Sequence, residues 1–188
     1  PHHAFVVAAA LFGEGMSSPL LDRLRERRGL VYHADCSTDV RESYGQFVVE
    51  ASTSPEHLGE YFVEVTQLLF EHVEATDPVG LERARNQITV RSLCAQEVPE
   101  QRLELAALDL FALSRVRPRE ELLAGIAAVT PSQVRRAFAE MLDAGPAVAL
   151  AGKIARGEEE RVAGLLARRA AEGWRFGTNP WGGNNDES

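Results

Sequence analysis

The chain has 188 residues, which is enough for one domain with a sizeable core, and 45% of them are hydrophobic. Its formal net charge is −8 and it has no basic block, so the electrostatic surface expected of a nucleic-acid-binding protein is absent from the sequence. Two cysteines, Cys36 and Cys94, cannot form a disulfide framework or a paired-cysteine zinc site, and both are expected to be small buried residues.

The first segment of the chain predicts a helix in two pieces. Residues 4–12 form an apolar run that is far shorter than the ~18 residues that span a bilayer, and no basic residue precedes it, so we expect a buried helix and no membrane segment or targeting signal. After an interruption at residues 13–18, the helical pattern resumes. Gly29 ends it, directly after arginines that favour the negative end of a helix dipole.

Two strands are expected next. From Leu30 the apolar period changes to two, and after a polar turn at residues 39–42 a second alternating run covers residues 44–52. The pair predicts an antiparallel hairpin with one apolar and one mixed face. Simple alternation places Tyr32 on the same face as Ala34 and Cys36.

Helices dominate the rest of the sequence, and most of them begin near a proline. These helix-start prolines are Pro55, Pro78, Pro99, Pro118 and Pro131. Residues 130–133 have the form of a capping box, and Gly145 with Pro146 ends that helix. A buried strand at residues 147–151, a last helix at residues 158–171 and a loosely ordered tail at residues 173–188 complete the prediction.

This order of elements predicts an α+β fold with two layers, in which helices cover one face of an antiparallel sheet. Residues 1–172 are expected to form a single domain. Three recognisable strands make a narrow sheet, so we expect that a further strand is missing from the chain.

Most patterns that could carry chemistry fail on inspection. Glu71 and His72 approach the H-x-x-E-H zinc motif, but Leu68 stands where the first histidine would be. Gly13 and Gly15 lack the third glycine and the preceding strand of a dinucleotide site. Ser17 and Ser18 lack a nucleophile elbow, and helix capping is the expected role. The five histidines have no spacing that implies a ligand set or a catalytic triad.

Arg25 and Tyr32 remain as candidate site residues. A guanidinium at a helix end and a phenol on the adjoining strand can both donate hydrogen bonds to peptide carbonyls, so together they can hold a bound chain. A phenol that reaches the carbonyl under attack would also stabilise an oxyanion. The alternative interpretation is that Arg25 only complements the helix dipole and Tyr32 only packs.

The sequence resembles the insulinase/pitrilysin-type zinc peptidases, which include mitochondrial processing relatives. The resemblance rests on Gly-x-Gly-Met-Ser-Ser at residues 13–18, Leu-Arg-Glu-x-Arg-Gly-Leu-x-Tyr at residues 24–32, Tyr-Gly-Gln-Phe at residues 44–47 and Ala-Val-Thr-Pro at residues 128–131. One departure is Pro19, where the family usually has arginine.

The resemblance implies the half of such a peptidase that does not bind zinc, with Arg25 and Tyr32 as its substrate-binding pair. It also implies that the chain starts after the first strand of that half, which would explain the narrow sheet. Zinc is then expected in a missing N-terminal half or a partner subunit, and this chain, without metal ligands or a cofactor, is expected to be inactive alone. The implied partners are that zinc-binding half and a peptide substrate. Two alternatives stay open: a non-catalytic scaffold of the same fold, like core subunits of respiratory complexes, and a stand-alone peptide-binding module.

Overall fold

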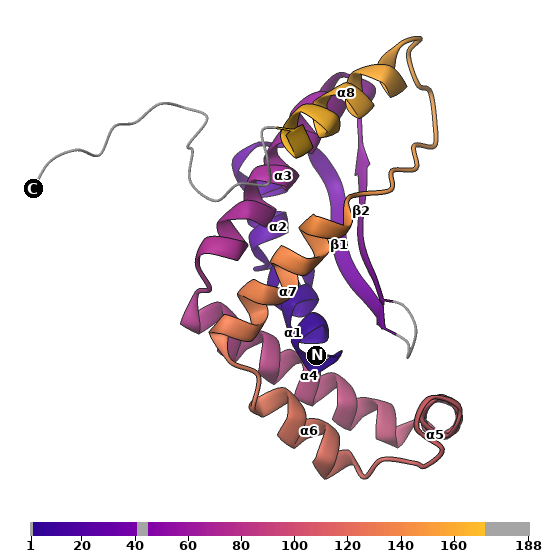
Figure 1. Ribbon diagram of the computed structural model, residues 1–188. Helices are drawn as coiled ribbons and strands as arrows, with labels where there is room; N and C mark the ends of the chain where they lie inside the picture. Colours follow the sequence, from indigo (N-terminus) through magenta and orange to yellow (C-terminus); the bar gives the residue numbers. More distant parts are fainter. Residues whose placement is uncertain (1, 41–44, 172–188) are drawn as a thin grey trace, which may run out of the picture.

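The computed structural model describes residues 2–40 and 45–171, and its helices lie on one face of a two-stranded antiparallel sheet (Figure 1). The two-layer α+β class expected from the sequence is therefore confirmed. The predicted tail at residues 173–188 lies outside the described residues. The elements, in chain order, are α1 (His2–Gly13), α2 (Pro19–Leu21), the π-helix η1 (Asp22–Arg27), β1 (Val31–Val40), β2 (Gly45–Thr53), the 3-10 helix η2 (Pro55–His57), α3 (Leu58–Glu74), α4 (Pro78–Glu97), α5 (Pro99–Leu113), α6 (Arg119–Ala127), α7 (Pro131–Ala144) and α8 (Glu158–Ala171).

Helix α1 lies at the centre of the core. It packs against β1, α4 and α7, and its residues from Val7 to Phe12 are almost completely buried. A helix that is apolar on every side must be covered on every side, so this arrangement is the one that its sequence requires. Among the described helices, none is both long enough and apolar enough to cross a bilayer.

Side-chain caps fix where several helices begin. Asp77 accepts hydrogen bonds from the backbone of Val79 and Gly80 at the start of α4, and Thr130 with Gln133 forms the predicted capping box of α7. Buried Ser18 accepts a hydrogen bond from the N–H of Leu21 and caps α2. Pro19, the departure from the resembling family, occupies the first turn of α2, where its missing N–H costs nothing.

The hairpin contains a β-bulge at Tyr32. Val31 pairs with Thr53 and His33 pairs with Ser52, so Tyr32 is an extra residue in β1 without a partner of its own. The bulge reverses the alternation: Val31 is buried together with Ala34, whereas Tyr32 is 90% exposed. The expectation that Tyr32 shares a face with Ala34 and Cys36 is therefore wrong.

Two other sequence expectations are corrected. Residues 147–151 are not a strand: within the described chain they pair with no neighbouring strand, and most of them are exposed. A strand needs a partner for its backbone hydrogen bonds, and without one a short apolar run does not form a strand. Cys94 is exposed rather than buried, because it lies on the outer side of α4, whereas Cys36 is buried as expected.

Candidate substrate-binding site

Arg25 lies in the π-helix η1, close to the end that precedes the hairpin. Its side chain is 43% exposed, and its Nε lies 3.6 Å from Oε1 of Glu26, the next residue in the chain. The Arg25 carbonyl accepts a hydrogen bond from Gly29 at 3.0 Å, which ends the helix. The guanidinium therefore has a loose contact with a sequence neighbour and remains accessible to a ligand.

Tyr32 reaches solvent from the bulge, and the backbone between it and Arg25 is held in place. The N–H of Leu30 donates to the carbonyl of Leu24 at 2.8 Å, and the Thr53 hydroxyl donates to the carbonyl of Leu30 at 2.6 Å. The structure thus brings η1 and β1 together through a fixed joint. The described contacts include none between the Arg25 and Tyr32 side chains, so any joint action of the two requires a ligand between them.

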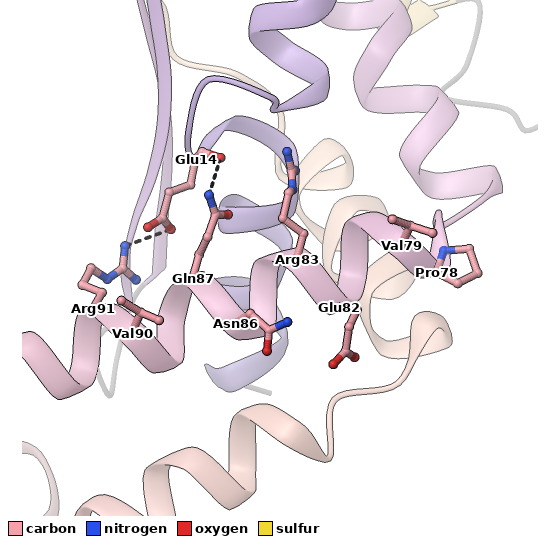
Figure 2. A pocket seen from close by; sticks show the side chains of 9 residues that line it. All are labelled: Glu14, Pro78, Val79, Glu82, Arg83, Asn86, Gln87, Val90 and Arg91. Atoms are coloured by element: carbon pink, nitrogen blue, oxygen red, sulfur yellow. Dashed lines mark hydrogen bonds and ion pairs between the residues drawn. The ribbon is translucent and has the colours of Figure 1, made fainter.

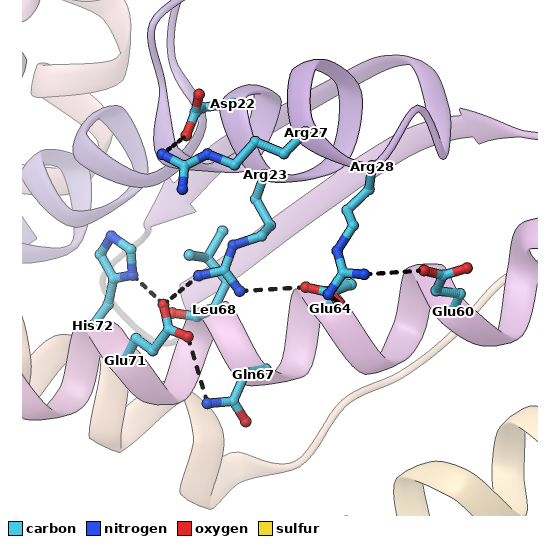
Figure 3. Close-up of polar contacts among 10 residues, drawn as sticks. All are labelled: Asp22, Arg23, Arg27, Arg28, Glu60, Glu64, Gln67, Leu68, Glu71 and His72. Carbon is cyan, nitrogen blue, oxygen red and sulfur yellow. Dashed lines mark hydrogen bonds and ion pairs between the residues drawn. The ribbon is translucent and has the colours of Figure 1, made fainter. Parts of the chain in front are cut away.

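A network of charged side chains holds η1 on α3 (Figure 3). Arg23 lies 2.7 Å from Glu71 and 3.3 Å from Glu64, and Arg28 lies 2.6 Å from Glu64. Arg23 and Arg28 are five residues apart, and the π-helix, whose hydrogen bonds join residues five apart, turns both toward α3. Arg25 takes no part in this network, and its described side-chain contact is the one with Glu26.

Burial and neighbouring charges shift the pKa of Arg23 in opposite directions. Partial burial alone would lower the pKa of Arg23, but the carboxylates of Glu71 and Glu64 outweigh it and raise the pKa. Glu64 is almost fully buried and accepts both guanidinium groups. A buried carboxylate needs such compensation, so the network depends on all of its members being present.

The residues at Glu71 and His72 do not fit zinc. Leu68, which stands at the first ligand position, has no ligating atom, and its carbonyl instead lies 2.7 Å from Nδ1 of His72. The His72 ring packs edge-on against Phe12, at a centroid distance of 5.2 Å, and Glu71 is bound to Arg23. In the described part of the chain, no three His, Cys, Asp or Glu side chains gather into a metal-binding group.

A surface groove of about 960 Å³ runs along α4 (Figure 2), and neither Arg25 nor Tyr32 lines it. Its polar side chains tie α4 to the end of α1 and to the turn that follows it. Arg91 lies 2.9 Å from the Glu14 carboxylate, and Gln87 donates to the Glu14 carbonyl. Arg83 donates to the carbonyl of Leu11 in α1. These groups are engaged in holding the turn, so the groove offers a ligand mainly apolar surface. Gly13 in this turn packs directly on Cys36, and a Cβ there would overlap it.

The N-terminal part of the chain matches a known family model. Residues 2–88 match the sequence profile described as "Peptidase M16 inactive domain". The resemblance to insulinase/pitrilysin-type peptidases is thereby confirmed: this part of the chain is similar to the inactive domain of the M16 peptidases.

Curated relatives agree with this assignment. The chain is 29% identical over 115 residues to a protein named "Uncharacterized zinc protease" from Rickettsia felis, with coverage of 61% of this chain and 28% of the relative. It is 28% identical over 158 residues to the alpha subunit of the mitochondrial-processing peptidase from Bos taurus, with coverage of 84% of this chain and 30% of the relative. The chain therefore spans less than a third of these relatives.

Solved structures share the fold at low sequence identity. A conserved protein from Enterococcus faecalis V583 aligns with a TM-score of 0.65 and 20% identity over 73% of this chain and 32% of its own. A chain of complex III2 from Candida albicans aligns with a TM-score of 0.67 and 13% identity over 74% of this chain and 36% of its own. These similarities establish the architecture.

The sequence singled out Arg25 and Tyr32 as candidates but did not predict the charged network between η1 and α3. A signal was available: Glu60, Glu64 and Glu71 recur along one side of α3 at helical spacing, and the preceding segment has an excess of arginine. What could not be read was the π-helix, because its register differs from the regular period that the pattern search assumes.

Proposed function

We propose that this chain is the non-catalytic, substrate-holding half of a zinc-dependent endopeptidase. The zinc ion and the general base are supplied by a separate half of the same polypeptide or by a partner subunit. Support comes from the match to an inactive domain, from relatives named as zinc protease and processing peptidase, and from the chain's span of less than a third of their length.

In this proposal Arg25 and Tyr32 bind the peptide. The observation that carries it is the bulge at Tyr32, which exposes a large aromatic side chain at a position where regular alternation would bury it. Bulges recur beside binding sites because they redirect a side chain without disturbing the rest of the strand. A bound peptide that lies over the joint between η1 and β1 accepts hydrogen bonds from the guanidinium and the phenol.

The two side chains have separable roles. Arg25 presents five N–H donors and holds backbone carbonyls or an acidic group of the peptide, which favours binding. Tyr32 presents one hydroxyl donor, and where it meets the carbonyl under attack it stabilises the negative charge that develops there. Neither residue is a zinc ligand or a general base, so the chain hydrolyses nothing alone.

The test is peptide hydrolysis by the assembly of this chain with its zinc-bearing half. Tyr32→Phe removes one donor and is expected to lower kcat/KM by about 100-fold, mainly through kcat. Arg25→Ala is expected to raise KM by about tenfold. Arg136→Ala is the matched control, since it removes another exposed arginine, on α7, and should keep the parent rate. Parent rates in both site variants would show that these residues do not hold substrate.

A second candidate function is a structural subunit without proteolytic activity. The observation that favours this function is the similarity to a chain of complex III2, which shares the architecture at 13% identity. The same assembly separates the two functions. An assembly that forms, carries zinc and cleaves no member of a peptide library would favour the structural role.

A further inference from the structure

Helix η1 is wound in the π register, in which backbone hydrogen bonds join residues five apart, and its charged contacts have the same spacing. Arg27 lies 2.7 Å from Asp22, which precedes it by five residues. Arg23 and Arg28, also five apart, both reach Glu64, at 3.3 and 2.6 Å (Figure 3). In an α-helix, residues five apart point about 140° away from each other, so neither contact suits the α register. Both contacts therefore favour the π register.

Glu64 is the residue through which α3 holds this register. It is almost fully buried, so its carboxylate has little freedom to follow a guanidinium that turns away. Glu71 and Glu60 each contact one of the two arginines, at 2.7 and 3.7 Å, and their side chains are 40% and 50% exposed. Among the described contacts, Glu64 is the carboxylate that binds both arginines. Loss of either contact leaves a buried charge less compensated, which opposes rewinding of the helix.

The register of η1 decides where Arg25 lies. In the π-helix, the N–H of Gly29 donates to the carbonyl of Arg25 at 3.0 Å, and the N–H of Leu30 closes the joint before β1. A π-helix holds about one residue more per turn than an α-helix, so a return to the α register would release a residue into that joint. Arg25 would then turn about the helix axis and shift relative to Tyr32. Short π segments are frequent at functional sites.

We propose that Glu64 is a positioning residue for substrate binding. By binding Arg23 and Arg28 together, it holds η1 in the π register and fixes the position of Arg25 relative to Tyr32. The inference rests on the proposed function, because it takes Arg25 as a residue that holds the peptide. Glu64 lies buried between η1 and α3 and acts through the helix, without touching the peptide.

The first experiment measures kcat and KM for peptide hydrolysis by the assembly of this chain with its zinc-bearing half. Glu64→Gln weakens both contacts to η1. Arg28→Met removes one of them, and because the Arg28 side chain is half exposed, this variant is expected to fold. Each variant is expected to raise KM by about three- to tenfold and to change kcat by less than about twofold. Arg136→Met, which removes a guanidinium from an exposed pair on α7, is the matched control and should keep the parent KM.

Repeating both substitutions in an Arg25→Ala background separates positioning from stability. Because Glu64 acts through Arg25, the double variants should have the KM of Arg25→Ala alone, within about twofold. A role in stability alone would lower the folded fraction, and with it the apparent kcat, in both backgrounds. Circular dichroism under the assay conditions gives the folded fraction of each variant.

A second experiment follows the register of η1 in the full chain without any assay of activity. Arg28→Met is expected to make the amides of Gly29 and Leu30 exchange at least about tenfold faster relative to the amides of α1, as measured by nuclear magnetic resonance. Arg136→Met should leave that ratio unchanged. The amides of α1 are the internal reference, because they report any loss of stability of the whole chain.

The outcomes distinguish this inference from the function on which it rests. A parent KM in both Glu64→Gln and Arg28→Met, together with a raised KM in Arg25→Ala, would overturn the positioning role and leave the proposed function standing. The same holds for a KM increase that recurs in full in the Arg25→Ala background, or for unchanged exchange at Gly29 and Leu30. A parent KM in Arg25→Ala itself would overturn both.

Discussion

Glu64 is the residue on which the attachment of η1 to α3 depends. It is 7% exposed and accepts Arg23 and Arg28, so its charge is compensated only while both arginines are in place. Glu64→Gln keeps the shape and removes the charge, which leaves two guanidinium groups with weaker partners. We expect the free energy of unfolding to fall by about 2 to 4 kcal/mol, measured by urea denaturation.

The matched control for Glu64 is a carboxylate in an exposed pair. Glu140 binds Arg136 one turn away on α7, and both side chains are largely in water. Glu140→Gln is expected to change stability by less than about 0.5 kcal/mol, since exposed ion pairs contribute little. Equal losses in the two variants would contradict the central position given to Glu64.

His72 makes stability depend on pH. Burial lowers the pKa of His72 from 6.5, although its contact with the Leu68 carbonyl opposes the shift. Above about pH 6.5 neither folded nor unfolded chain holds this proton. As the pH falls below that value, the unfolded chain gains the proton first, so stability is lost. The free energy of unfolding of the parent chain should fall between about pH 7.5 and about pH 5.5. In His72→Leu this fall should be smaller by about 1 kcal/mol.

A packing variant beside His72 provides the control. The Phe138 ring packs at a tilt against the same imidazole, at a centroid distance of 5.2 Å, and does not titrate. Phe138→Leu is expected to lower the free energy of unfolding by about 1 to 2 kcal/mol at both pH values and to keep the parent's pH dependence. A pH dependence that is the same in His72→Leu as in the parent chain would assign it to other groups.

Substituting alanine for glycine is expected to have opposite effects on stability at Gly29 and at Gly164. Gly29 has φ of 62° at the end of η1, and Gly164 lies within α8; a Cβ would meet no atom within 4 Å at either position. Gly29→Ala is expected to cost about 1 kcal/mol because of the left-handed backbone. Gly164→Ala is expected to stabilise by about 0.5 to 1 kcal/mol, because it restricts the unfolded chain. Thermal unfolding measures both, and a gain at Gly29 would contradict the backbone argument.

Helices were predictable where side chains near the start specify them. Pro78 after Asp77 and the Thr130 capping box are local signals, so the first residues of α4 and α7 follow from the sequence. The strand expected at residues 147–151 failed because pairing is not a local property. A short apolar segment becomes a strand only beside a partner, and the sequence of that segment alone says nothing about the neighbour.

At the candidate site, too, some features were predictable from the sequence and others depended on the folded backbone. The residue types at Arg25 and Tyr32 were readable, but the exposure of Tyr32 was not, because one extra residue in β1 reverses every side chain that precedes it in the strand. The π-helix had a similar effect on Arg23 and Arg28. The sequence therefore offered these two residues as candidates, and the bulge in β1 decided the exposure of Tyr32.

The molecule as a whole is built around α1. We expect local stability to be highest in the elements that pack on this helix and lower in those farther from it. β1, α4 and α7 all pack on α1, and the largest buried side chains, including Phe12 and Phe138, belong to this group. Helix α8 instead packs on the outer side of α3, and the exposed segment at residues 145–157 leads to it. Figure 1 places α8 at the end of the molecule farthest from α5. Regions with few buried contacts open without unfolding the rest.

We therefore expect α8 to exchange its amide hydrogens by local opening. Among the described positions of α8, the one strongly buried apolar side chain is Val162, which is 3% exposed. Burial of this side chain contributes about 1.5 to 3 kcal/mol, which is less than the free energy of unfolding of a whole domain. Hydrogen exchange followed by mass spectrometry should show α8 exchanging well before α1 at the same pH and temperature. Val162→Ala should accelerate exchange in α8 and leave α1 unchanged, because the substitution shifts only the local equilibrium. Acceleration of both helices to the same extent would mean that α8 belongs to the same cooperative unit as the core.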